Sequence, residues 1–217
     1  HTNFVTASGL DADEHYSTAY DMALIGAYAI KNKTFLEITN TKSYHLSDVD
    51  NKRNITVTNK DAFLTMDNNA IGIKTGFTGK AGYCFVGAIK SKGRVFVSSV
   101  LACGWPPNKS YKWKDTMCLM NYGKDNYDYK NLLKKNKEIN VNVERGTKKS
   151  IKASIIGSSK YLLNSHEKYN FKTNISYKYP IKENDKIGTV DIFIEDNKVQ
   201  TRNIIAKEAV SEYNFKY

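Results

Sequence analysis

The sequence has few cysteines and no long apolar stretch. Its three cysteines, Cys84, Cys103 and Cys118, are an odd number without C-x-x-C spacing, which argues against a zinc site or a disulfide framework. Each lies among apolar residues, so we expect three buried free thiols. No segment approaches the apolar length of a membrane-spanning helix. The sequence also lacks a starting methionine and a signal peptide, so we expect His1 to be an interior position of a longer precursor.

Composition predicts a folded protein with a basic surface. The chain is 41% hydrophobic and carries a formal net charge of +11, and the hydrophobic content is ordinary for a globular protein. From Tyr129 onward there are 18 Lys and Arg against 10 Asp and Glu. Because no zinc-finger spacing or RNA-recognition signature is present, nucleic acid is not an expected partner. The surplus lysines indicate a solvated surface, with contact to an anionic membrane or cell wall as the alternative.

Two domains are expected, residues 1–128 and 129–217, because the hydrophobic pattern changes near this point. In the first, Ser17-Thr18 followed by Asp21 predicts a helix start, and apolar residues then recur at helical spacing. Strands are predicted at 54–58, 70–76, 83–89 and 94–102, the last two joined as a hairpin across Lys90–Gly93. A further helix is predicted around residues 113–120.

After residue 139 the apolar residues alternate with polar ones, which predicts short half-buried strands. Turns are expected at Arg145-Gly146, Glu183–Asp185 and Glu195–Asn197. The second domain is therefore predicted to be a small all-β sandwich. Four tyrosines of this segment are expected to pack across strands in the core, with stacking on a glycan or protein as the alternative: Tyr161, Tyr169, Tyr177 and Tyr179.

The tripeptide Lys74-Thr75-Gly76 is the most informative short motif. It ends the apolar run 70–73 and continues into Phe77–Tyr83. On a strand, Lys74 and Gly76 point to one face and Thr75 to the other. A glycine there permits close approach of a ligand, and a lysine beside a threonine hydroxyl suits a carboxylate. Taken alone, the tripeptide is equally consistent with an exposed strand end.

The context of this tripeptide resembles one protein family. The segment Gly72–Tyr83, which reads Gly-Ile-Lys-Thr-Gly-Phe-Thr-Gly-Lys-Ala-Gly-Tyr, resembles the Lys-Thr-Gly strand of the low-molecular-weight penicillin-binding proteins, the D-Ala-D-Ala carboxypeptidases. Gly9–Asp11 and His15–Ala23 resemble an upstream segment of the same family. The stretch Leu101–Trp113 looks closest to enzymes of spore-forming Gram-positive bacteria, and the tail resembles the family's C-terminal domain.

The resemblance implies an α+β fold: the C-terminal part of a transpeptidase-like domain, with packing helices on an antiparallel sheet, followed by the sandwich. It implies that Lys74, Thr75, Gly76 and Phe77 bind substrate. Lys74 would act electrostatically, Thr75 would hold the terminal carboxylate, and the backbone N–H of Phe77 would stabilise an oxyanion. Some relatives carry histidine where Phe77 stands. Lys109 is a weaker candidate for a further positive charge, and no cofactor or metal is implied.

The resemblance also shows what this chain lacks. The family nucleophile is the serine of Ser-x-x-Lys, accompanied by Ser-x-Asn, and both should precede Gly9. The chain contains one Ser-x-x-Lys, Ser165–Lys168, and no Ser-x-Asn. Because Ser165 lies in the β-rich tail, we interpret that match as coincidence. We therefore expect no catalytic residue in this chain and no turnover by the chain alone.

The expected function is that of a serine-type D-Ala-D-Ala carboxypeptidase of peptidoglycan metabolism, located outside the cytoplasm in the cell envelope and membrane-associated when full length. Expected partners are stem peptides ending in D-Ala-D-Ala, β-lactams and an N-terminal segment that completes the catalytic domain. Without that segment, an apolar face should be exposed. The alternatives are a non-catalytic wall-binding scaffold and, less favoured because of the long β-rich tail, a serine β-lactamase.

Overall fold

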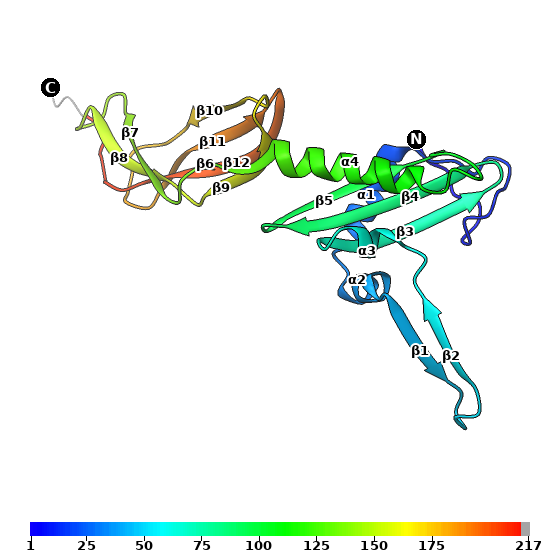
Figure 1. Cartoon of the computed structure of the whole chain (residues 1–217). Helices are drawn as coiled ribbons and strands as arrows, with labels where there is room; N and C mark the ends of the chain where they lie inside the picture. Colours follow the sequence, from blue (N-terminus) through cyan, green and yellow to red (C-terminus); the bar gives the residue numbers. More distant parts are fainter. Residues whose placement is uncertain (214–217) are drawn as a thin grey trace. The chain divides into compact units, whose positions relative to one another are not determined.

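The computed structural model describes residues 1–213. The chain forms two compact units, His1–Asn126 (unit 1) and Tyr127–Tyr217 (unit 2) (Figure 1). Unit 1 mixes helices and strands, whereas unit 2 is built from strands in its described part. The predicted α+β class with antiparallel sheets is confirmed. Across residues 1–213 no helix is long and apolar enough to cross a membrane.

Unit 1 is built around a three-stranded antiparallel sheet with a helix on each face (Figure 1). The strands pair in the order β3 (Ala70–Thr78), β4 (Gly82–Ser91), β5 (Arg94–Val100). Successive side chains of β4 point to opposite faces. Phe85 and Ile89 therefore pack against α4 (Tyr111–Asn126), while Val86 and Ala88 pack on the side of α1 (Ala19–Ala29). One strand thus supplies both cores.

The turn between β4 and β5 has the geometry that the sequence predicts. Ser91 pairs with Arg94, which leaves Lys92 and Gly93 as a two-residue loop. Both have positive φ, 50° and 74°, as a type I′ hairpin turn requires. The predicted hairpin is confirmed.

A two-stranded ribbon, β1 (Ser43–Ser47) and β2 (Asn54–Thr58), extends away from the rest of unit 1 (Figure 1). Its register places Tyr44 opposite Val57 and Leu46 opposite Ile55, so these four apolar side chains share one face. Each is between 45% and 58% exposed. The ribbon follows α2 (Lys33–Asn40) and precedes the short α3 (Phe63–Met66). Sequence analysis predicted β2 but neither β1 nor α2.

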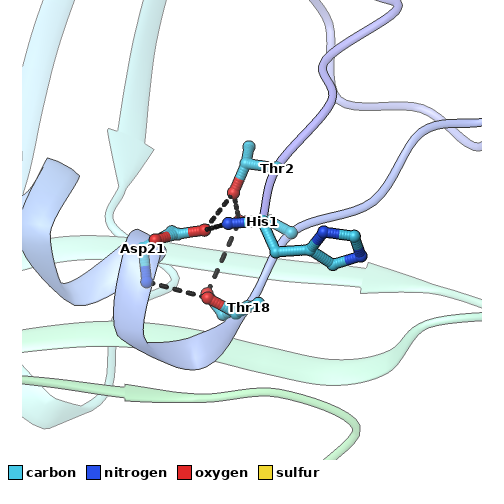
Figure 2. A network of polar contacts seen from close by, with 5 residues as sticks. His1, Thr2, Thr18 and Asp21 are labelled. Carbon is cyan, nitrogen blue, oxygen red and sulfur yellow. Dashed lines mark hydrogen bonds and ion pairs between the residues drawn. The ribbon is translucent and has the colours of Figure 1, made fainter.

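The start of α1 is held by a polar network (Figure 2). The Thr18 side chain caps the helix by accepting the backbone N–H of Asp21 at 3.0 Å, as predicted. The Asp21 carboxylate in turn accepts from the His1 amino group at 2.7 Å and from the Thr2 hydroxyl at 2.6 Å. The first residues of the described chain are thereby tied to α1.

Unit 2 contains a five-stranded antiparallel sheet and a two-stranded sheet. The larger sheet has the order β10–β11–β12–β8–β7, and the smaller pairs β6 with β9. Their bounds are β6 Tyr127–Leu133, β7 Lys137–Asn142, β8 Ser150–Ile155, β9 Ser159–Asn164, β10 Tyr169–Ile175, β11 Lys186–Ile194 and β12 Asn197–Ala206. Leu132 and Leu163 of the smaller sheet pack against Ile192 of the larger. The predicted sandwich is therefore confirmed.

The tyrosines of unit 2 divide between core and surface. Tyr177 and Tyr179 pack against the main core, and Tyr161 packs against the second cluster, as predicted. Tyr169 is 43% exposed, so core packing is wrong for this residue.

The cysteine prediction is half right. All three thiols are free, but Cys84 and Cys103 are only half-buried and Cys118 is exposed. Apolar neighbours in sequence did not imply burial. Cys118 lies on the outward side of α4, Cys84 lies opposite the exposed Gly76 of β3, and Cys103 lies in the loop after β5.

Asp61 predicts a pH dependence of unit 1. Its Oδ1 accepts the Phe63 N–H at 3.0 Å, while its buried Oδ2 has no hydrogen-bond partner within residues 1–213. Burial raises the pKa of Asp61 from 3.8 to about 6, although the Phe63 bond and the Lys112 charge lower it. A raised carboxyl pKa gives stability that is fully present below 3.8 and lost as pH rises through about 6.

Asp61→Asn keeps an acceptor for Phe63 but removes this titration. We expect the variant to lose less unfolding free energy than the parent between pH 4 and pH 7. Both tryptophans, Trp105 and Trp113, lie in unit 1, so urea unfolding followed by tryptophan fluorescence reports on it. Equal pH dependence in the two proteins would contradict the assignment.

Candidate functional site

The four predicted site residues lie on β3, an edge strand of the unit 1 sheet. Lys74, Gly76 and Phe77 are exposed, and Thr75 is half-buried. Lys74 pairs with Val86 and therefore faces the α1 side. Thr75 and Phe77 pair with Phe85 and Tyr83 and therefore face the α4 side. The Phe77 ring lies 4.5 Å from the Tyr83 ring, centroid to centroid.

Hydrogen bonds of Tyr83 determine which backbone groups of β3 are free. Tyr83 donates its N–H to Gly104 O at 2.9 Å and accepts the Cys103 N–H at 2.8 Å. In an antiparallel sheet both backbone groups of a residue point to the same side. Both backbone groups of Tyr83 point away from β3, so Tyr83 and its partner Phe77 form a non-hydrogen-bonded pair. The N–H groups of Phe77 and, two residues earlier, Thr75 therefore point out from the free edge.

The Lys74 ammonium lies at this same edge. Its Nζ donates to the carbonyl oxygen of Thr75, which points outward with the Thr75 N–H. The edge thus presents one positive charge and two outward N–H groups within four consecutive residues. Such a set of donors suits a carboxylate or a developing oxyanion.

Packing within unit 1 does not require a glycine at position 76. A Cβ there would meet only Cys84 Cβ, at 3.7 Å, an ordinary contact. Its backbone also lies outside the positive-φ region. The open space beside Lys74 is therefore available to a ligand that approaches the strand.

A bulge in front of the motif sets its register. The pairing of β3 with β4 shifts between Ala70 and Ile73, and Gly72 within the bulge has φ of 109°. A Cβ on Gly72 would lie 3.0 Å from Thr39 Oγ1. Because one residue of slip reverses every side chain of a strand, this bulge decides which face Lys74 occupies.

The two sequence segments that carry the family resemblance meet in the structure. Thr78, at the end of β3, donates its hydroxyl proton to Asp11 Oδ1 at 2.8 Å, across 67 residues of sequence. The Thr78 hydroxyl oxygen also accepts the Ala81 N–H at 3.0 Å. The Gly9–Asp11 segment is thereby fixed beside the end of β3. Sequence analysis noted both segments but did not predict this contact.

The loop after β5 packs on the turn that follows β3. Trp105 Nε1 donates to Gly79 O at 2.8 Å. Gly82 has φ of 69°, and a Cβ there would lie 2.9 Å from Gly104 O and from the Trp105 ring. Only glycine fits this approach. The loop therefore holds both Gly104, which binds Tyr83, and the turn that ends the motif.

The remaining candidates lie elsewhere. Lys109 is exposed in the loop before α4. Burial lowers the pKa of Lys112, and the nearby charge of Lys109 lowers it further. Lys109 therefore acts on the α4 side, opposite to the face of Lys74. Ser165 is exposed in the turn between β9 and β10 of unit 2, where Asn164 Oδ1 accepts the N–H groups of His166 and Glu167. His15 accepts the Val5 N–H at 3.0 Å, in a structural contact.

Cys84 is a neighbour of the site that sequence analysis placed only as a core residue. It pairs with Gly76 and so shares the face of Lys74 and Gly76. The turn between Thr78 and Gly82 sets the register of β3 and β4. Counting back from that turn in the sequence would have placed Cys84 opposite Gly76. No group of three or more His, Cys, Asp or Glu side chains in residues 1–213 is placed to hold a metal ion.

Comparison with known proteins agrees with this geometry. The D-alanyl-D-alanine carboxypeptidase family matches residues 1–103, and the family described as penicillin-binding protein 5, C-terminal domain, matches residues 127–212. Both matched parts of the chain are thus similar to low-molecular-weight D-Ala-D-Ala carboxypeptidases. The first of these matches includes Asp11, all of β3 and Cys103, and it ends just before Gly104 and Trp105.

Individual relatives cover almost the whole chain. D-alanyl-D-alanine carboxypeptidase DacA of Escherichia coli K12 is 28% identical over 99% of this chain and 53% of its own length. DacF of Bacillus subtilis is 24% identical over 99% of this chain and 56% of its own. The crystal structure of penicillin-binding protein 5 from Haemophilus influenzae aligns with a TM-score of 0.61 and 26% identity, over 97% of this chain and 61% of that one. The chain thus spans about half the length of the curated relatives it matches.

The bulge at Gly72 is directly testable. We expect Gly72→Ala to destabilise unit 1 by about 1–3 kcal/mol, because an alanine is strained at positive φ and its Cβ crowds Thr39. Gly79→Ala is the matched control, since a Cβ there meets nothing within 4 Å. Tryptophan-detected urea unfolding compares the two. An unchanged midpoint for Gly72→Ala would show that the bulge is not required.

Proposed function

We propose that this chain supplies the substrate-binding strand of a serine-type D-Ala-D-Ala carboxypeptidase of peptidoglycan metabolism. The observation that carries the proposal is the free edge of β3, where Lys74 Nζ and the outward N–H groups of Thr75 and Phe77 lie together. The reaction is taken from the D-alanyl-D-alanine carboxypeptidases that the chain resembles. The substrate is a stem peptide ending in D-Ala-D-Ala, and β-lactams are its competitors.

In the proposed reaction a serine Oγ attacks the carbonyl carbon between the two D-alanines. The backbone N–H of Phe77 stabilises the oxyanion that forms. The Lys74 ammonium and the Thr75 hydroxyl bind the terminal carboxylate. The C–N bond breaks, D-alanine leaves as its nitrogen takes a proton, and water then hydrolyses the ester and frees the serine. The open space at Gly76 lets the substrate lie along the strand.

The nucleophile must come from outside unit 1 of this chain, which contains no Ser-x-x-Lys and no Ser-x-Asn. An N-terminal segment of the whole protein is the proposed source. Support comes from the surface of α1, where Tyr20, Leu24, Ile25 and Tyr28 are 43% to 76% exposed. Such an apolar face was expected if part of the domain is contributed by another segment.

The same region offers a place for that segment. Tyr20 and Leu24 of α1, with Val95 and Val97 of β5, line an open groove. Beside it, β5 forms the other edge of the sheet within the described residues. A further strand paired with β5 would cover the groove and bury the exposed face of α1. Lys74 lies on this same side of the sheet, at the opposite edge.

In this proposal residues 1–128 belong to the catalytic domain and residues 129–217 form the C-terminal domain. The protein acts outside the cytoplasm, in the cell envelope, and the full-length form is membrane-associated. The basic excess of unit 2 supports a position near an anionic surface. No role with nucleic acid is proposed.

Labelled penicillin tests the proposal on the intact protein that includes the N-terminal segment. We expect Lys74→Ala to slow acylation by about 100-fold or more, because a charge that stabilises the bound carboxylate and transition state is removed. Lys80→Ala, an exposed lysine in the following turn, should label at the parent rate. Equal labelling of Lys74→Ala and the parent protein would contradict the assignment of Lys74 as a substrate-binding residue.

Gly76→Ala separates ligand access from folding. The added methyl group fits the fold, so its urea midpoint should match the parent, while acylation should be strongly impaired. Intact protein without a Ser-x-x-Lys, and without any labelling, would instead be a scaffold that has kept the fold. Rapid turnover of the labelled penicillin, without D-Ala release from a stem peptide, would identify a β-lactamase.

A further inference from the structure

The edge strand β10 of unit 2 leaves an apolar face uncovered. Its residues Tyr169, Phe171 and Ile175 are 41% to 43% exposed, although they point to the core side of the sheet. The register shows this directly: Phe171 pairs with Ile192, which is completely buried. Across the described part of unit 2, β10 contributes no residue to either core cluster. The two-stranded β6–β9 layer packs over β11 but does not extend over β10.

The backbone groups of the same residues are free. Glu195 donates its N–H to Lys168 O at 2.8 Å, and Ser176 donates to Ile187 O at 3.0 Å. These bonds lie at the two ends of β10, and the alternation of an antiparallel ladder runs between them. Asn170, Lys172 and Asn174 therefore bond to β11. The backbone N–H and C=O groups of 169, 171, 173 and 175 point outward, so each exposed apolar residue also offers unpaired hydrogen-bonding groups.

The opposite edge of the sheet, β7, lacks this combination. Its inward residue Val141 is 5% exposed, against 43% for Phe171. Val143 donates its N–H to Lys149 O, so the odd-numbered residues of β7 bond to β8 and the even-numbered ones, including Asn140, face outward. β7 has free backbone groups but a covered apolar face. The edge strand β7 therefore serves as an internal control for β10.

Lys172 is the only charged residue within β10. Lys172 pairs in register with Asp191, but the Asp191 carboxylate is already bound by Asn174, Thr201 and Lys198. Lys172 forms no ion pair within residues 1–213. An occupant with acidic side chains would therefore find an uncompensated positive charge along the strand. A second copy of β10 would instead bring a second Lys172 to the same edge, and like charges on neighbouring strands are unfavourable.

We propose that β10 binds an extended segment of another protein, in which apolar side chains alternate with acidic ones. The segment adds as a sixth strand, pairing with the outward groups of residues 169–175. Its apolar side chains cover Tyr169, Phe171 and Ile175, and its acidic side chains lie on the face of Lys172. Unit 2 is in this respect a docking module that accepts a strand from a partner.

The test uses the full chain and two fluorescein-labelled nine-residue peptides. One is capped Ser-Glu-Val-Glu-Val-Glu-Val-Glu-Ser, and the other carries lysine in place of each glutamate. Fluorescence anisotropy at low and at physiological salt measures binding. We expect saturable binding of the glutamate peptide and much weaker binding of the lysine peptide. Absence of saturable binding, or equal binding of both peptides, overturns the proposal.

Two variants locate the site. Thr173→Pro removes one outward N–H at a position where an edge strand tolerates proline, and binding should weaken by about threefold to tenfold. Asn140→Pro makes the same change on β7 and should bind as the parent does. Lys172→Gln leaves the backbone intact and should reduce the preference for the glutamate peptide. Equal losses in Thr173→Pro and Asn140→Pro, or an unchanged preference in Lys172→Gln, would overturn the assignment to β10.

Two other occupants are distinguished in the same way. A concentration-dependent dimer in sedimentation, abolished by Thr173→Pro and not competed by the glutamate peptide, would assign the edge to a second copy and contradict the proposal. Binding to phosphatidylglycerol vesicles that Lys172→Gln abolishes, with no peptide binding, would assign it to a lipid surface and contradict it equally.

Discussion

The backbone N–H and C=O of Tyr83 both form hydrogen bonds on the side away from β3. This constraint determines which backbone groups at the edge of the sheet are free to bind a ligand. Tyr83 binds Gly104 and Cys103, so its partner Phe77 has no ladder bond and directs its N–H outward. Had the pairing been one residue different, Lys74 would face α4 and the Phe77 amide would be consumed by the ladder. The proposed carboxylate and oxyanion contacts depend on this single register.

Several features far apart in sequence maintain that register. Gly72 absorbs the bulge before Lys74, Thr78 bonds to Asp11 after it, and Trp105 holds the following turn through Gly79. Gly82 makes room for the Trp105 loop, which in turn carries Gly104. Each contact is ordinary in strength, but all of them fix the same strand. The site is therefore positioned by its surroundings and not by the tripeptide alone.

Sequence patterns predicted the elements whose signals are local. The capped start of α1 and the Lys92-Gly93 hairpin follow from short-range chemistry, and each of the three turns predicted in the tail contains a residue with positive φ: Arg145, Asn184 and Glu195. One strand of the tail, β12, was not predicted. β12 follows a correctly predicted turn, but Lys198, Gln200 and Arg202 break its apolar alternation, and only its pairing with β11 and β8 makes it a strand. β1 has no core to pack against, so no burial pattern marked it.

Sequence analysis proposed residues for the candidate site but not their geometry. Lys74, Thr75, Gly76 and Phe77 stand out in the sequence, whereas the free edge depends on a long-range bond to the 103–104 loop that no local pattern encodes. Amide hydrogen exchange of the intact protein, before and after acylation by a β-lactam, measures that edge directly. Strong protection of the Thr75 and Phe77 amides on acylation, with Lys74 and Gly76 already protected by the ladder, is the result expected here. Protection confined to other strands, with Thr75 and Phe77 exchanging as before, would contradict the assignment of β3 as the substrate strand.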